Sequence, residues 1–172
     1  MKKLFIIVII IMALPSHSFG EWLNGVTDDG ESYYAATMND SGNILGLYCY
    51  PASDNCIWLL GMSTACKEGD QYLVLSNSDK GSSPITLYCH RKLTNNVYSY
   101  AFTDFDLINN IVTKGIRVGF AVPLESDQFK VIRFNLSSSN VAIAKMKADY
   151  ENAQKRSSSR TSKTTGTKDQ NI

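Results

Sequence analysis

The chain has 172 residues, 44% hydrophobic and 10% aromatic, which is enough apolar sequence for one folded domain. Residues 21–150 carry 10 basic and 14 acidic side chains, a net charge of −4, whereas residues 151–172 carry 5 basic and 2 acidic ones, a net charge of +3. A mildly acidic body lacks the basic face that would neutralise phosphates, which argues against nucleic acid as a partner.

The first twenty residues have the three parts of a bacterial signal peptide. Two lysines open the segment, an apolar core follows over residues 4–14, and the small residues Ser18 and Gly20 precede an expected cleavage before Glu21. A membrane span needs about 20 apolar residues, and this run has roughly half of that. We therefore expect an exported mature chain that has no transmembrane anchor after signal cleavage.

Short stretches rich in Tyr, Val, Ile and Leu then alternate with turn residues. Residues 21–32 show little periodicity, and we expect Trp22 and Leu23 to anchor them to the core. We expect strands at 33–38, 43–50, 56–62, 71–75, 85–90, 97–102, 116–124 and 128–136. Strands that recur in this way with turn chemistry between them predict an all-β fold, a small antiparallel β-sandwich or barrel.

Two helices interrupt the strand pattern. The first is expected over 106–113, with Asp106 as its N-cap and Gly115 as a left-handed stop. The second is expected over 140–152, because its apolar residues recur at helical spacing. Residues 153–172 have no apolar face, so we expect a disordered, basic, polar tail after a folded domain over 21–152.

The four cysteines all lie in the expected mature part. An even number of cysteines in an exported chain indicates two disulfides. The sequence alone does not choose among the three pairings, but the short loop before Cys56 favours Cys49–Cys56, which leaves Cys66–Cys89. Zinc is the competing interpretation, and the spacing lacks the paired C-x-x-C knuckles of structural zinc sites.

We find no catalytic set in the sequence and expect no cofactor and no metal. His90 is the one histidine after residue 20, and no G-x-S-x-G elbow accompanies it. Asp104 and Asp106 are explained as a turn and a helix cap. The acidic residues over 28–31 are explained as a solvated loop, although paired carboxylates could in principle hydrolyse a glycoside.

The tyrosines are the candidate binding residues. Tyr48 and Tyr50, like Tyr98 and Tyr100, are two residues apart on an expected strand, so each pair shares one face of the sheet. Two explanations stay open: the rings fill the core, or they form an exposed aromatic platform for a partner or glycan.

The segment from Tyr98 to Met146 resembles a known family. A short helix leads to Lys114-Gly115, a strand over 116–122 follows, and a second strand ends at Ile132-Arg133-Phe134-Asn135-Leu136. This pattern resembles the C-terminal half of the invasion-associated locus B family of exported bacterial proteins. The resemblance implies a periplasmic or surface β-sandwich with an accessory role and no catalytic residues.

Three classes of function follow from these expectations. The first is a non-enzymatic periplasmic accessory or binding module for an envelope protein or polymer such as a glycan. The alternative is a secreted or surface-exposed inhibitor or adhesin-like module that acts on a host or competitor molecule. A hydrolase that works through paired carboxylates is the third. The sequence names no ligand.

Overall fold

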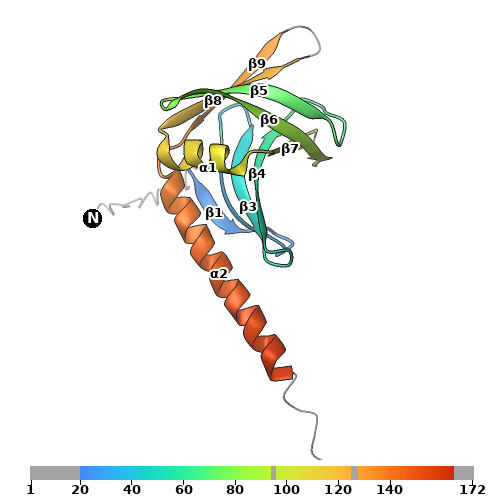
Figure 1. Cartoon of the computed structure of the whole chain (residues 1–172), viewed down its shortest axis with the longest axis vertical. Helices are drawn as coiled ribbons and strands as arrows, with labels where there is room; N and C mark the ends of the chain where they lie inside the picture. The colour runs from blue at the N-terminus through green and yellow to red at the C-terminus, as the bar shows by residue number, and fades with distance from the viewer. Residues whose placement is uncertain (1–19, 94–95, 125–127, 165–172) are drawn as a thin grey trace, which may run out of the picture.

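The computed structural model describes residues 20–93, 96–124 and 128–164, and side chains as far as Arg156. Apart from Gly20, the expected signal peptide lies outside the described residues. Nine strands form one antiparallel sheet in the order β1-β2-β3-β4-β7-β6-β5-β8-β9 (Figure 1). The strands are β1 (Leu23–Val26), β2 (Tyr33–Met38), β3 (Ile44–Tyr50), β4 (Asn55–Met62), β5 (Gln71–Ser78), β6 (Gly81–Lys92), β7 (Tyr98–Phe102), β8 (Arg117–Pro123) and β9 (Phe129–Asn135).

The inward face of the curled sheet holds the core. Trp58, Leu60 and Phe120 are fully buried, and the Phe120 ring lies between those of Phe102 and Phe134, with centroids 5.3 and 6.4 Å away. The predicted all-β fold with two helices is therefore confirmed. The described strands form one curled sheet instead of the two packed sheets of a sandwich, and the hydrogen-bond ladder does not close into a barrel.

Side chains bridge the gap between the two edges of the sheet. The indole Nε1 of Trp22, just before β1, donates a hydrogen bond to the carbonyl of Asn135 at 3.1 Å. The amide Nδ2 of Asn39, just after β2, donates to the carbonyl of Arg133, also at 3.1 Å. Both carbonyls belong to the free edge of β9, so these contacts satisfy groups that an open edge strand would expose.

Strand β1 was not anticipated. It pairs with β2, with Leu23 opposite Ala36, but its four residues include Gly25 and are too few to show an alternating pattern. The expectation for Trp22 is confirmed, since its ring is buried and lies edge-on to Trp58. The expectation for Leu23 is wrong, because its side chain is 48% exposed.

Helix α1 (Phe105–Lys114) begins and ends differently from the prediction. Its N-cap is Asp104, whose carboxylate accepts a hydrogen bond from the Leu107 amide, whereas Asp106 lies within the first turn. Gly115 is not left-handed: its φ of −86° is extended. Glycine is needed there because a Cβ would lie 2.6 Å from the carbonyl oxygen of Ile111.

Helix α2 (Ser139–Thr164) continues twelve residues beyond its expected end at 152, so residues 153–164 are helical and not the disordered tail that was predicted. Its first half packs on β1 and β2 through Ile143, Met146 and Tyr150, and its second half projects past the sheet (Figure 1). A helix that is already nucleated by packing can extend into sequence that has no apolar face of its own. Residues 165–172 lie outside the described part of the chain.

The loop between β3 and β4 holds the middle of α2. The Tyr150 hydroxyl donates a hydrogen bond to Oδ1 of Asp54 at 2.8 Å, and the Gln154 amide donates to the same oxygen at 2.6 Å. These hydrogen bonds, from Tyr150 first, lower the pKa of Asp54 from its ordinary value. Asp54 itself has a φ of +48°, a conformation that Asp and Asn tolerate better than most residues.

Acid should therefore destabilise the native protein more steeply than the Asp54→Asn variant, which keeps the turn. A carboxylate whose pKa is lowered by folding adds stability above its unfolded pKa of about 3.9 and loses it as the pH falls through the folded pKa. Urea unfolding of both proteins across that pH range measures the difference. Parallel pH profiles for the two proteins would contradict the account.

Both favoured disulfides are present. Cys49–Cys56 joins directly opposed residues of β3 and β4, with the two Cα atoms 4.0 Å apart. Cys66–Cys89 ties the loop after β4 to β6, with the two Cα atoms 6.0 Å apart. Among the described helices, none is both long and apolar enough to span a membrane.

Candidate functional site

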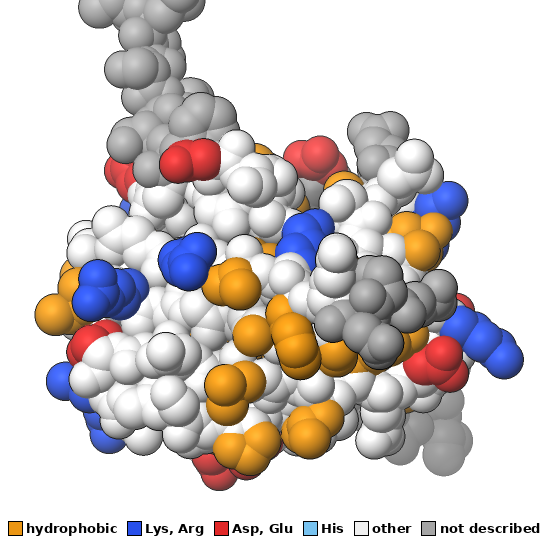
Figure 2. Space-filling view, turned by 90° about the horizontal axis from the view of Figure 1, so that it is seen from above, with side chains coloured by type: hydrophobic (Ala, Val, Ile, Leu, Met, Phe, Trp, Pro, Cys, Tyr) orange, Lys and Arg blue, Asp and Glu red, His pale blue; other side chains and the backbone are white. Residues whose placement is uncertain are grey.

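The outer face of β5, β8 and β9 exposes apolar side chains next to one another. Leu75 is opposite Ala121, which is in turn opposite Val131. Leu73 and Phe129 lie two residues earlier on their strands and therefore on the same face. We call Leu73, Leu75, Phe129 and Val131 the outer apolar surface; they are 66%, 50%, 68% and 49% exposed. Figure 2 looks onto this end of the molecule and shows hydrophobic side chains gathered near Lys and Arg side chains.

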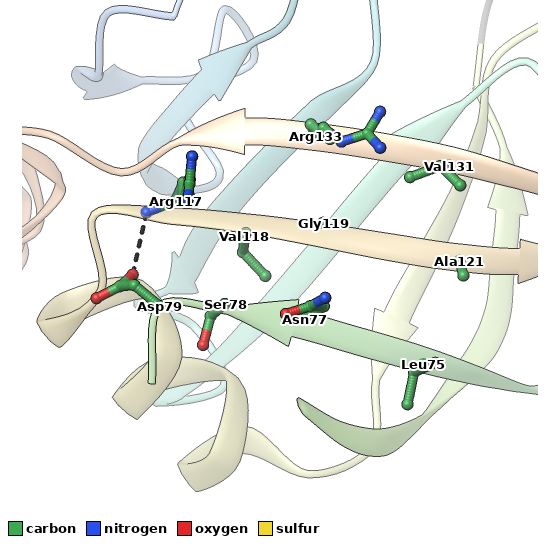
Figure 3. Close-up of a pocket in the computed structure, with 10 residues that line it drawn as sticks. All are labelled: Leu75, Asn77, Ser78, Asp79, Arg117, Val118, Gly119, Ala121, Val131 and Arg133. Carbon is green, nitrogen blue, oxygen red and sulfur yellow. Dashed lines mark hydrogen bonds between the residues drawn. The ribbon is translucent and has the colours of Figure 1, made fainter. Parts of the chain in front are cut away.

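A groove of about 480 Å³ follows β8 beside this surface. Its floor is made by the small residues Gly119 and Ala121, and its two banks are formed by β5 and β9. The banks carry Leu75 and Asn77 on one side and Val131 and Arg133 on the other (Figure 3). The groove exists because the middle strand has almost no side chain where its neighbours have large ones. We call it the β8 groove.

One end of the β8 groove is positively charged. The guanidinium groups of Arg117 and Arg133 are exposed and make no ion pair with the described residues. The nearby Asp79 is not paired with either arginine side chain, and its Oδ1 accepts hydrogen bonds from the Ile116 and Arg117 amides at 2.7 and 3.3 Å. Its other oxygen, Oδ2, lies 3.6 Å from the Lys80 ammonium. These amides, Ile116 first, lower the pKa of Asp79, so this carboxylate stays ionised and engaged.

The lining of the β8 groove combines charged and apolar side chains. Two unpaired guanidinium groups can hold an anionic group, and the apolar banks can hold an apolar one. Asp79 is the single carboxylate among the residues that line the groove. The lining therefore lacks the pair of carboxylates that hydrolyses glycosides.

Two of the predicted tyrosines line a second, smaller pocket on the outer face. Tyr48 and Tyr50 face a space of about 210 Å³ together with Asp29, Glu31 and Arg91. We call it the tyrosine pocket. Tyr34 stacks on Tyr48, with ring centroids 6.0 Å apart, and burial raises the pKa of Tyr48 to about 12. The carboxylate of Asp29 is bound by the Thr27 hydroxyl at 2.6 Å and the Glu31 amide at 2.9 Å, so it shapes the turn that covers the pocket.

The other two predicted tyrosines lie on the opposite, inward face. Tyr100 is 1% exposed, and its hydroxyl donates a hydrogen bond to the Thr64 carbonyl at 2.9 Å. Burial raises the pKa of Tyr100 to about 12. Tyr98 pairs with the buried Met62 and packs against the core. Of the two open explanations, Tyr98 and Tyr100 therefore agree with filling the core, and they do not belong to a binding face. A two-residue spacing shows that residues share a face, but it does not show which face is buried.

The remaining candidates for chemistry are dispersed. His90 lies at the bulge between Cys89 and Arg91, and burial, followed by the charge of Arg91, lowers its pKa. Its buried Nδ1 atom has no hydrogen-bond partner among the described residues. The carboxylate of Asp104 caps the N-terminus of α1. Within the same residues, no group of three or more His, Cys, Asp or Glu side chains could hold a metal ion.

Sequence reasoning missed the outer apolar surface, although the sequence holds a signal for it. The strand segment 72–75 is apolar at every position. One face of it packs on the core, so apolar side chains on the other face remain exposed and available to a partner. Arg117 and Arg133 give no such signal, since lone arginines on expected strands are ordinary surface residues.

Comparison with protein-family models, with curated proteins and with solved structures finds no match. The resemblance to the invasion-associated locus B family therefore stays a prediction.

Proposed function

We propose that the protein is a non-catalytic binding module that works in the periplasm, where it docks an envelope protein through the outer apolar surface and the β8 groove. The observation that carries this proposal is the exposure of Leu73, Leu75, Phe129 and Val131 on one face. Contiguous apolar surface is costly to leave in water, and where it persists it commonly marks an interaction site.

Two further observations support the proposal. Both disulfides suit an oxidising compartment such as the periplasm, in agreement with the signal-like first twenty residues. The arginines at the end of the β8 groove give the surface a charged rim beside an apolar centre, an arrangement typical of protein–protein interfaces. The charged rim beside the apolar centre favours a protein partner over a small substrate.

Affinity capture from crosslinked intact cells tests the proposal. The double variant Leu75→Thr/Val131→Thr keeps residues with high strand propensity but makes the surface polar. The matched control is Val141→Thr on α2, where the valine is 66% exposed. We expect the native protein and the control to recover the same envelope partner and the double variant to lose it. Undiminished recovery by the double variant would contradict the proposal.

The tyrosine pocket favours a second candidate, a secreted or surface module that binds a host or competitor molecule. It brings Tyr48 and Tyr50 beside two acidic side chains and Arg91, and such mixed aromatic and polar pockets suit a polar ligand such as a glycan. The same capture experiment separates the candidates. Recovery of the protein from the culture medium, with a target that the double variant still binds, would favour the tyrosine pocket.

A further inference from the structure

We propose that the β8 groove binds an extended segment of the partner protein in which an acidic residue is followed, at every second position, by apolar residues. This inference rests on the proposed function and deepens it, since it assigns the chemistry of the segment that the outer face takes. It draws on the charge at one end of the groove, the spacing of its banks and a polar group on one of them.

The charge at the groove end selects an acidic side chain. Gly119 is opposite Arg133, and Arg117 is opposite Asn135, so the two arginines are diagonal neighbours across β8 and β9. The Asp79 carboxylate, the single carboxylate in the lining, accepts hydrogen bonds from two backbone amides and forms an ion pair with Lys80. A carboxylate entering this end of the groove would meet two guanidinium groups that make no ion pair with Asp79, and Arg pairs with carboxylates through charge-assisted hydrogen bonds.

The spacing of the banks selects an extended peptide. Arg133, Val131 and Phe129 stand at every second residue of β9, which places them about 7 Å apart along the strand. An extended peptide that lies along the groove repeats its side chains at the same interval. When its acidic residue reaches Arg133, its next inward residue reaches Val131 and Leu75 on the two banks. The following inward residue reaches Phe129 and Leu73, which lie beyond the groove lining on the outer apolar surface.

One polar group on the β5 bank favours a peptide over a hydrocarbon chain. The side-chain amide of Asn77 makes no hydrogen bond with the described residues. Ser78 does not contribute, since its hydroxyl donates to the Gly81 carbonyl and accepts from the Lys80 amide. A peptide backbone offers the Asn77 amide both donors and acceptors. An acyl chain would cover this amide without compensation, which is unfavourable for a polar group.

Gly119 allows the groove to be filled without disturbing the fold. A Cβ at this position would meet its nearest neighbour, Cγ of Arg133, at 3.6 Å, which is ordinary contact, and the backbone is not left-handed. Valine also has a higher strand propensity than glycine. Gly119→Val should therefore leave the melting temperature unchanged or raise it while its side chain occupies the floor of the groove.

Fluorescence anisotropy with labelled peptides tests the inference on the purified exported protein. The probes contain Asp-Ser-Leu-Ser-Phe within Gly/Ser flanks, the reverse order for the opposite chain direction, and an Asn-for-Asp version of each. We expect saturable binding of at least one Asp peptide, its loss in Gly119→Val, and weakening of about tenfold or more in Arg133→Gln. The Asn peptides should bind the native protein more weakly than the Asp peptides do. This difference between Asp and Asn peptides should shrink in Arg133→Gln, because that variant has already lost one of the guanidinium groups that the carboxylate contacts.

Three results would overturn the inference. The first is that neither Asp peptide binds the native protein. The second is that Gly119→Val still binds the peptides although this variant has a normal melting temperature. The third is that the native protein binds laurate and not the peptides, and that Gly119→Val loses the laurate. Val141→Thr serves as the control and should bind like the native protein. If the peptides fail but Leu75→Thr/Val131→Thr still loses the envelope partner, this inference falls and the proposed function stands.

Discussion

Replacing Cys66 with serine should lower the melting temperature by about 10 °C. The Cys66–Cys89 disulfide closes a loop with a sequence separation of 23, and the chain-entropy estimate for such a loop is about 3 kcal/mol. A chain of this size loses about 10 °C for a destabilisation of that magnitude. Thermal unfolding followed by circular dichroism without reductant measures the change.

The second disulfide provides the matched comparison. Cys49–Cys56 has a sequence separation of only 7, so Cys56→Ser should lose about 2 kcal/mol, less than Cys66→Ser, and both replaced cysteines are half-buried. The order of the two effects follows from loop length. An unchanged melting temperature for Cys66→Ser, or the reverse order, would refute this account of how the disulfides stabilise the sheet.

Truncating Trp22 to alanine should destabilise the protein by about 3–5 kcal/mol, the usual cost of removing a buried tryptophan side chain. The ring is 6% exposed, packs edge-on against Trp58 and holds the edge of β9 through the Asn135 carbonyl. Trp22→Phe keeps most of the ring contact and loses the hydrogen bond, so it should cost about 1 kcal/mol. Urea unfolding at neutral pH measures both values.

A substitution at the adjacent Leu23 is the control for the Trp22 variants. It belongs to the same segment but is 48% exposed, so Leu23→Ala should change the free energy of unfolding much less. If Leu23→Ala and Trp22→Ala were equally destabilising, the bridge between the two edges of the sheet would not be the source of the effect.

The sequence predicted the secondary structure well where a single local rule governs it. The strand over 33–38 and the alternation that buries Ile132, Phe134 and Leu136 agree with the structure. The prediction failed where an element depends on distant contacts. Strand β1 forms because its backbone pairs with the edge of β2. Helix α2 continues past residue 152 because its first half is packed on the sheet.

The candidate site could be predicted only in part for a related reason. Alternation correctly placed Tyr48 with Tyr50 and Tyr98 with Tyr100, but only the curl of the sheet decides that Tyr100 is inside. The β8 groove needs residues from β5, β8 and β9, and the register of those strands is set by the fold as a whole. No local pattern brings Arg133 next to Gly119.

The most direct test of the central claim, that the outer face of β5, β8 and β9 docks an envelope partner, is photo-crosslinking in intact cells. A photoreactive amino acid replaces Val131 in one strain and Val141 in another, since both valines are well exposed but lie on different elements. We predict a discrete adduct with an envelope protein at position 131 and none at position 141. No adduct at 131, or the same adduct at both positions, would contradict the claim.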